Sequence, residues 1–302
     1  IYERHSRRSE GRAIVISMRI LISTGIYPPD TGGPAQYARN LYETWKKQGH
    51  DVKVAAYRWE RAFMPGIRHL LFFLKILRKG YNADLILVLD TWSAAVPTMF
   101  ACKLMGKKYI VRTGGDFLWE SYIERTGDTV RFGEFYETRL PKLNRKERMF
   151  YTLGGKALRA ASRIIFSAPW QKGIFEKTYG LDPTRTCIVE NFCGEREEFV
   201  QPENRAFVAG TRALKGKNSE LLKEAFEEAR VEIKRRGLPD ITLDTSRCIY
   251  DSFIEKMRRS YAVILVSLGD MSPNMIFDAI RVGVPYVVTK ERSEEHTSEL
   301  QS

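Results

Sequence analysis

Residues 261–289 place the strongest constraint on how this chain can fold. The run YAVILV at 261–266 is continuously apolar, which is typical of a strand buried on both faces. A polar loop follows it. Ser272 and Pro273 then favour a helix start, because serine caps free N–H groups and proline fits the first helical position. Gly283 predicts the end of that helix, and residues 286–289 predict another strand. We therefore expect a strand–loop–helix–strand unit of a parallel sheet, with ligands bound at its loop.

Two aspartates mark this unit, Asp270 in the loop and Asp278 in the helix. Asp278 stands among apolar neighbours, so its carboxylate needs a partner. The N-terminus of the helix, near Ser272 and Asn274, offers free N–H groups and a positive dipole end that suit a phosphate. Carboxylates beside it suit the hydroxyls of a sugar or a ribose. A capped helix with a surface aspartate is the alternative without a ligand.

The spacing of these acids, with SPN between them and DAIRVGVPYVVT after, resembles the donor-sugar motif of retaining GT-B glycosyltransferases of the family-four type. In that family two glutamates flank seven residues, whereas here both are aspartates, each shorter by one methylene group. The resemblance implies an α/β fold of two Rossmann-like domains facing a cleft. It also implies transfer of a sugar, with retention, from a nucleotide sugar to a glycan or lipid-linked acceptor. Asp270 would be catalytic at the donor sugar, Asp278 would hold the ribose, and Ser272 and Asn274 would meet phosphate.

A basic loop precedes this unit, between an expected strand at 206–209 and an expected helix at 219–236. In the resembled family an arginine and a lysine five positions apart hold the donor diphosphate, and Arg212 and Lys217 have that spacing. Two cations there would neutralise the leaving diphosphate. Lys215 is an alternative cation, and a solvated basic loop is the alternative without function. We expect no cofactor and no metal, because these cations and the helix N-terminus supply positive charge.

The first half of the chain begins, from Met18, with an expected strand at 18–23 and a loop that contains Gly32 and Gly33. The paired glycines let a ligand come close to the backbone, and Pro34 favours a helix start. The segment YPPDTGGPAQYARNL resembles the glycine loop that faces the inter-domain cleft in the same family, and it is not a GxGxxG fingerprint. Asp116 is the last residue of an expected strand segment at 107–116, where members of the resembled family often place an active-site acid or histidine. We take it as a second catalytic candidate, with a turn-forming role as the alternative.

The domain boundaries follow from composition. We expect residues 1–17 to be a non-native leader, 18–193 an N-terminal acceptor domain and 205–291 a C-terminal nucleotide-sugar domain, joined by a polar linker. Residues 292–302, RSEEHTSELQS, resemble the translation of a sequencing adapter. We therefore expect an artefact tail and an incomplete second domain.

The net charge of +12 favours anionic partners, namely sugar nucleotides or anionic lipid. The sequence shows no nucleic-acid recognition motif. Four scattered cysteines without a CxxC pair fit a cytoplasmic protein with reduced thiols.

Residues 61–80 are basic and amphipathic, and we assign Leu70, Leu71, Phe73, Leu74 and Leu77 to the apolar face. An ordinary core-facing helix and a peripheral membrane contact both fit this pattern. Two other functions remain open beside the transferase. One is a non-catalytic relative that binds a nucleotide sugar or a lipid, and the other is an epimerase of sugar nucleotides on the same fold.

Overall fold

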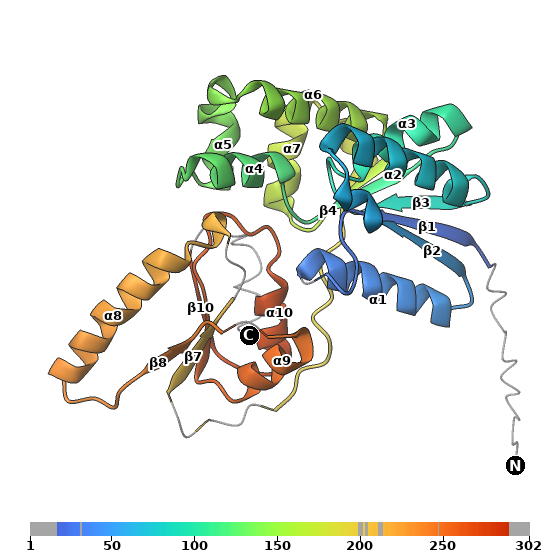
Figure 1. The fold of residues 1–302 in the computed structure, drawn as a ribbon. Coiled ribbons are helices and arrows are strands. Elements are labelled where there is room, and N and C mark those ends of the chain that lie inside the picture. Colours follow the sequence, from blue (N-terminus) through green and yellow to red (C-terminus); the bar gives the residue numbers. More distant parts are fainter. Residues whose placement is uncertain are drawn as a thin grey trace, which may run out of the picture.

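The chain forms two parallel β-sheets with helices on both faces of each (Figure 1). The computed structural model describes residues 17–30, 32–198, 202, 205–210, 214–246 and 248–289. The predicted α/β class with two Rossmann-like units is therefore confirmed. Residues 1–16 of the expected leader, Arg212 and the expected tail lie outside the described residues.

The first sheet has the strand order β2-β1-β3-β4-β5-β6, and all its strand pairs are parallel. Its strands are β1 (Arg19–Thr24), β2 (Asp51–Ala56), β3 (Leu85–Val88), β4 (Ile110–Thr113), β5 (Arg163–Phe166) and β6 (Thr186–Ile188). The order reverses between β1 and β3, because the chain adds β2 on one side of β1 and β3 on the other. In open parallel sheets, ligands bind in the crevice outside the carboxyl ends of the strands at such a switch point.

Helices cover both faces of this sheet because its strands are apolar on both sides. Ile20 and Ile22 of β1 pack with Ala38 on one face, while Leu21 packs with Phe72 on the other. Figure 1 shows α1 on one side of the sheet and α2, α3 and α6 on the other. The helices are α1 (Gly33–Lys47), α2 (Pro65–Gly80), α3 (Ala95–Met105), α4 (Phe117–Thr126), α5 (Phe132–Thr138), α6 (Arg145–Ala160) and α7 (Pro169–Tyr179), with short 3-10 turns η1 (Trp59–Ala62), η2 (Leu140–Lys142) and η3 (Pro183–Arg185).

The second sheet has the order β10-β9-β7-β8, again all parallel. Its elements are β7 (Ala206–Ala209), η4 (Lys215–Lys217), α8 (Ser219–Arg235), β8 (Thr242–Asp244), α9 (Tyr250–Arg258), β9 (Ala262–Leu265), α10 (Asn274–Arg281) and β10 (Tyr286–Val288). Leu222 and Phe226 of α8 pack on one face, and α9 and α10 cover the other. The neighbouring Leu221 is 49% exposed. The strand–loop–helix–strand unit at 261–289 is present as β9, α10 and β10.

The helix α2 differs from its predicted orientation. Phe72 and Ile76 are the apolar side chains that it buries, whereas Leu70 and Leu74 are 57% and 50% exposed. Phe73 and Leu77 of the predicted apolar face pack against the core. The prediction of one continuous face is wrong for Leu70 and Leu74, because the core contacts the side of α2 that carries Phe72 and Ile76. No helix in the described ranges has both the length and the apolar character needed to cross a bilayer.

Candidate functional site

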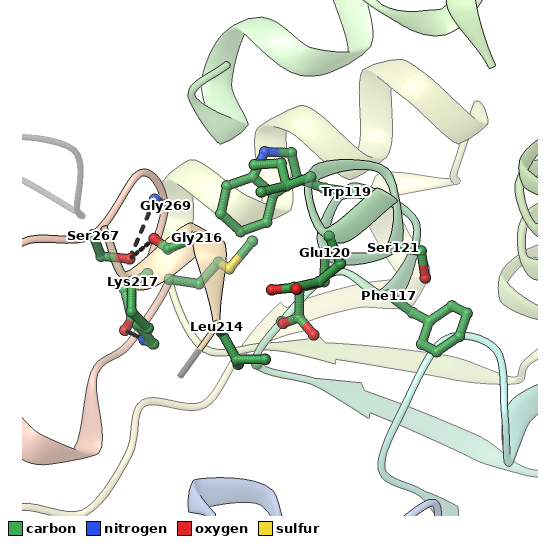
Figure 2. Close-up of a pocket in the computed structure, with 15 residues that line it drawn as sticks. Phe117, Trp119, Glu120, Ser121, Leu214, Gly216, Lys217, Ser267 and Gly269 are labelled. Atoms are coloured by element: carbon green, nitrogen blue, oxygen red, sulfur yellow. Dashed lines mark hydrogen bonds and ion pairs between the residues drawn. The ribbon is translucent and has the colours of Figure 1, made fainter. Parts of the chain in front are cut away.

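A cavity of about 240 Å³ lies between α4 of the first sheet's unit and two loops of the second (Figure 2). One loop contains η4, and the other follows β9. The lining side chains and backbone come from Gly114, Gly115, Phe117, Trp119, Glu120, Ser121, Ile123 and Glu124 on one side, and from Leu214, Gly216, Lys217, Ser267, Gly269, Asp270 and Met271 on the other. The cavity therefore joins residues that are far apart in the sequence.

Lys217 and Asp270 form an ion pair in the wall of this cavity. Both side chains are partly buried, with 29% and 17% of their surfaces exposed. The pair brings together two of the residues predicted from the sequence, one from the basic loop and one from the loop after β9. A cation held here by a carboxylate can exchange that partner for the phosphate of a ligand.

Backbone contacts hold the two units together around the cavity. The Phe132 N–H donates to the Leu268 carbonyl at 3.2 Å, and the Lys215 N–H donates to Glu124 Oε1 at 2.7 Å. Gly269 is required at this contact, because a Cβ there would lie 2.6 Å from Phe132 Cβ. The close approach of the Asp270 loop to Phe132 therefore requires glycine at position 269.

The helix α4 presents acids to the cavity that sequence reasoning missed. Glu120 and Glu124 are four positions apart and therefore lie on one face of the helix. Figure 2 shows the Glu120 carboxylate within the cavity, across from Lys217. The i, i+4 spacing was visible in the sequence, but nothing in it indicated that this face meets the second sheet.

Asp116 does not line the cavity, so the expectation that it faces the cleft needs correction. Its carboxylate caps α4 by accepting from the Trp119 N–H at 2.9 Å, and it also accepts from the Tyr136 hydroxyl. Only 2% of the residue is exposed, and burial raises the pKa of the carboxyl. The acid turns inward because the free N–H groups at the start of α4 and a buried tyrosine both need an acceptor.

The N-terminus of α10 meets the first unit through Asn191. The Asn191 amide donates to Asn274 Oδ1 at 2.7 Å and to the Ser272 carbonyl at 3.1 Å. Ser272 does not cap α10 as predicted, because Pro273 takes the N-cap position and no side chain bonds the free N–H groups. Those groups remain available to an anion.

The paired glycines, Gly32 and Gly33, also lie close to the N-terminus of α10. Gly32 is the N-cap of α1 and Gly33 its first residue. A Cβ added at Gly33 would lie 2.9 Å from Asn274 Nδ2, so the start of α1 and the start of α10 are in close contact. The structure thus brings the glycine loop to the inter-sheet contact.

Asp278 lies on α10, and its side chain is 14% exposed. It accepts from the Tyr250 hydroxyl at 2.7 Å, and Arg281 is 3.7 Å away. Burial raises the pKa of the Asp278 carboxyl. Asp278 is not among the residues that line the cavity. The sequence analysis predicted that the Asp278 carboxylate needs a partner, and the structure shows that this partner is the Tyr250 hydroxyl.

Among the described residues, no cluster of three His, Cys, Asp or Glu side chains could hold a metal ion. The expectation that the site works without a metal stays a prediction.

No protein-family model and no curated protein sequence matches this chain. Solved structures do match it. Sucrose-phosphate synthase from Thermosynechococcus elongatus superposes with a TM-score of 0.61 at 11% identity, over 90% of this chain and 81% of that chain. An α,α-trehalose-phosphate synthase (UDP-forming) from Burkholderia xenovorans, in complex with glucose-6-phosphate, has a TM-score of 0.53 at 9% identity, over 92% and 86%. UDP-GlcNAc 2-epimerase from Methanocaldococcus jannaschii has a TM-score of 0.53 at 11% identity, over 93% and 87%.

These similarities define the fold as GT-B, with two Rossmann-like units. At such low identity the likeness concerns the fold alone. The similar structures include both glycosyltransferases and an epimerase, so the fold is shared by the two kinds of enzyme.

Proposed function

We propose that this protein is a retaining glycosyltransferase that moves a sugar from a nucleotide-sugar donor to a glycan or lipid-linked acceptor. The observation that carries the proposal is the Lys217–Asp270 ion pair in the inter-sheet cavity. In this proposal the lysine serves the leaving diphosphate and the aspartate beside it serves the donor sugar. The resemblance in sequence supports this reaction, and the GT-B fold is compatible with it.

In this proposal the residues predicted from the sequence have separate roles. Lys217, with Arg212 from the same loop, stabilises negative charge on the diphosphate as the glycosidic bond breaks. The free N–H groups at the start of α10, near Ser272 and Asn274, bind phosphate oxygens. Asp270 leaves Lys217 and accepts hydrogen bonds from the donor sugar. Asp278, with Tyr250 holding its carboxylate, binds the ribose hydroxyls.

The acceptor enters from the side of α4. Trp119 and Phe117 give the cavity apolar surface, while Glu120 and Glu124 give it hydrogen-bond acceptors. Aromatic surface beside carboxylates suits the apolar faces and hydroxyls of a sugar. We expect no metal, because Lys217, Arg212 and the α10 N-terminus supply the positive charge.

An epimerase is the second candidate, because the fold also occurs in UDP-GlcNAc 2-epimerase. A non-catalytic relative is the third, since both motif acids are aspartates. One experiment separates the three. Nucleotide sugars are first screened for thermal stabilisation, since a ligand that binds only the folded state raises the Tm. Turnover of the best donor is then measured with and without a panel of acceptors. A transferase consumes donor and forms a glycoside only with acceptor, an epimerase converts donor without one, and a binding protein does neither.

We further propose that the protein works at the inner face of a membrane, in the cytoplasm, with α2 in contact with lipid. Trp59, Met64, Ile67, Leu70 and Leu74 are all exposed along η1 and α2. Exposed Arg78 and the net charge of +12 would favour an anionic surface.

A further inference from the structure

The guanidinium of Arg112 is buried at the carboxyl end of β4, next to the contact between the two units. Only 8% of the residue is exposed. The guanidinium lies over the Tyr37 ring, 3.8 Å from its centroid, and one nitrogen donates to Asn191 Oδ1. Its Nε is buried and has no hydrogen-bond partner. The Arg112 guanidinium therefore contacts an aromatic ring and a side-chain amide, and its Nε–H donates no hydrogen bond.

No carboxylate of the described residues forms an ion pair with Arg112. A buried charge without a counter-ion is costly, and buried cations in proteins are ordinarily paired. Burial lowers the pKa of Arg112, but an arginine stays charged in proteins. An anion from outside the chain would remove this cost.

The surroundings of Arg112 favour such an anion. Tyr37, which stacks on the guanidinium, belongs to the second turn of α1, and Asn191 joins it to the start of α10. Neither helix has an acid in its first turn, and neither N-terminus is capped by a side chain. Gly33 and Asn274 bring the two helix starts into contact. Positive potential from two helix dipoles and one guanidinium thus converges on one place.

We propose that Arg112 and the first turn of α1 form a binding site for a phosphate group. In the free protein the guanidinium donates to Asn191 Oδ1. On binding, a phosphate replaces Asn191 as the acceptor and accepts from two guanidinium nitrogens. The site is additional to the contacts assigned to Lys217 and Asp278, and it lies beside the start of α10, to which the proposed function assigns donor phosphate. The phosphate group belongs either to a sugar phosphate or to a nucleotide, and the chemistry that recognises it is the same.

Thermal unfolding of the whole chain tests this site, with sodium phosphate, glucose 6-phosphate and nucleoside diphosphates as separate probes at matched ionic strength. Wild-type protein should gain Tm with inorganic phosphate. Arg112→Gln keeps a donor for Asn191 but removes the charge. It should unfold at the same or a higher temperature than wild type without phosphate. Its phosphate affinity should fall at least about tenfold, which is about 1.4 kcal/mol.

Arg163→Gln is the matched control, since Arg163 is an exposed arginine at the start of β5, and its phosphate response should equal that of wild type. Arg112→Lys is the second variant, should the glutamine variant not fold. It keeps the charge but loses the paired donors, so it should bind phosphate more weakly than wild type. A loss confined to glucose 6-phosphate or to the diphosphates identifies the source of the phosphate group.

The proposal is overturned if wild type shows no phosphate response, or if the phosphate affinity of the Arg112 variants equals that of wild type. If the Arg112 variants keep the wild-type phosphate affinity but unfold at a lower temperature, Arg112 has only a structural role. Nucleotide sugars that fail to bind while phosphate still stabilises would refute the proposed transferase and leave this site standing.

Discussion

Asn191 Nδ2 donates to Asn274 Oδ1 at 2.7 Å, which ties the segment that joins the two sheets to the first residue of α10. The same amide accepts from Arg112 through Oδ1. One side chain therefore links β4 of the first sheet to the helix that carries Asp278. Together with the Phe132–Leu268 and Lys215–Glu124 hydrogen bonds, this link joins the two units.

Removal of Lys217 should weaken the binding of nucleoside diphosphates. Lys217→Ala deletes a charge-assisted contact, so we expect a loss of about 1–3 kcal/mol in binding free energy. Calorimetric titration measures it. Lys223→Ala, at an exposed position on α8, is the control and should bind like wild type. Equal affinity in the Lys217 variant would remove Lys217 from the donor site.

Asp278→Asn should lower nucleotide affinity about tenfold while the fold survives. Asparagine can still accept from the Tyr250 hydroxyl, but it lacks the charge that strengthens hydrogen bonds from ribose. The measurement compares affinity for a nucleoside diphosphate with affinity for inorganic pyrophosphate, which has no ribose. Only the first should fall, and Asp278→Glu should bind at least as well as wild type. Loss of both affinities to the same extent would argue against ribose contact.

Asp116 should matter for stability and not for turnover. Its folded pKa is raised above the ordinary value of 3.8. Its contribution to stability is therefore complete below the unfolded pKa, and it is lost as the pH rises through the folded pKa. Asp116→Asn cannot titrate, so its free energy of unfolding should improve relative to wild type between pH 4 and pH 7. Urea unfolding at both pH values measures this. A large loss of kcat with unchanged stability would restore Asp116 as a catalytic residue.

Gly33→Ala should loosen the contact between α1 and α10. The new Cβ would meet Asn274 Nδ2 at 2.9 Å, so the Asn274 amide, which accepts from Asn191 through Oδ1, must shift. Because this amide ends a flexible side chain, we expect the cost to be that of the Asn191–Asn274 hydrogen bond, about 0.5–1.5 kcal/mol of stability. Gly66→Ala is the matched control near the start of α2, where a Cβ meets nothing within 4 Å. Thermal unfolding compares the two variants. Equal Tm values would show that the contact between α1 and α10 does not contribute to stability.

Exposed leucines of α2 should support binding to anionic vesicles. Leu70→Ser with Leu74→Ser removes apolar surface worth about 3 kcal/mol if both side chains enter the lipid. Co-sedimentation with vesicles of phosphatidylglycerol and phosphatidylcholine should therefore fall strongly. Val231→Ser on α8, which removes a 70% exposed side chain, serves as the control. Wild-type protein that stays in the supernatant would rule out this membrane contact.

Much of the fold was predictable from local pattern. Short apolar runs located the strands, and the order of strands and helices indicated two parallel sheets. The motif residues Lys217 and Asp270 were predicted separately, from two loops, and the structure pairs them. Both loops leave the carboxyl ends of neighbouring strands, β7 and β9, which explains why their side chains meet.

The orientation of single side chains was decided by tertiary structure. Asp116 stands after a strand, as an active-site acid would, yet a buried tyrosine and a helix N-terminus turn it inward. Leu70 and Leu74 have the spacing of a core face, but α2 buries Phe72 and Ile76.

The sequence by itself determined the class of fold, the position of the glycine loop and the positions of Asp270 before α10 and Asp278 on it, because strand lengths and helix ends are local properties of the chain. Only the tertiary structure decided that Glu120 lines a cavity with Asp270 and that Arg112 is buried without an acid. These relations join residues from different sheets. Their distance in space depends on how two units pack, which periodicity along one chain does not encode.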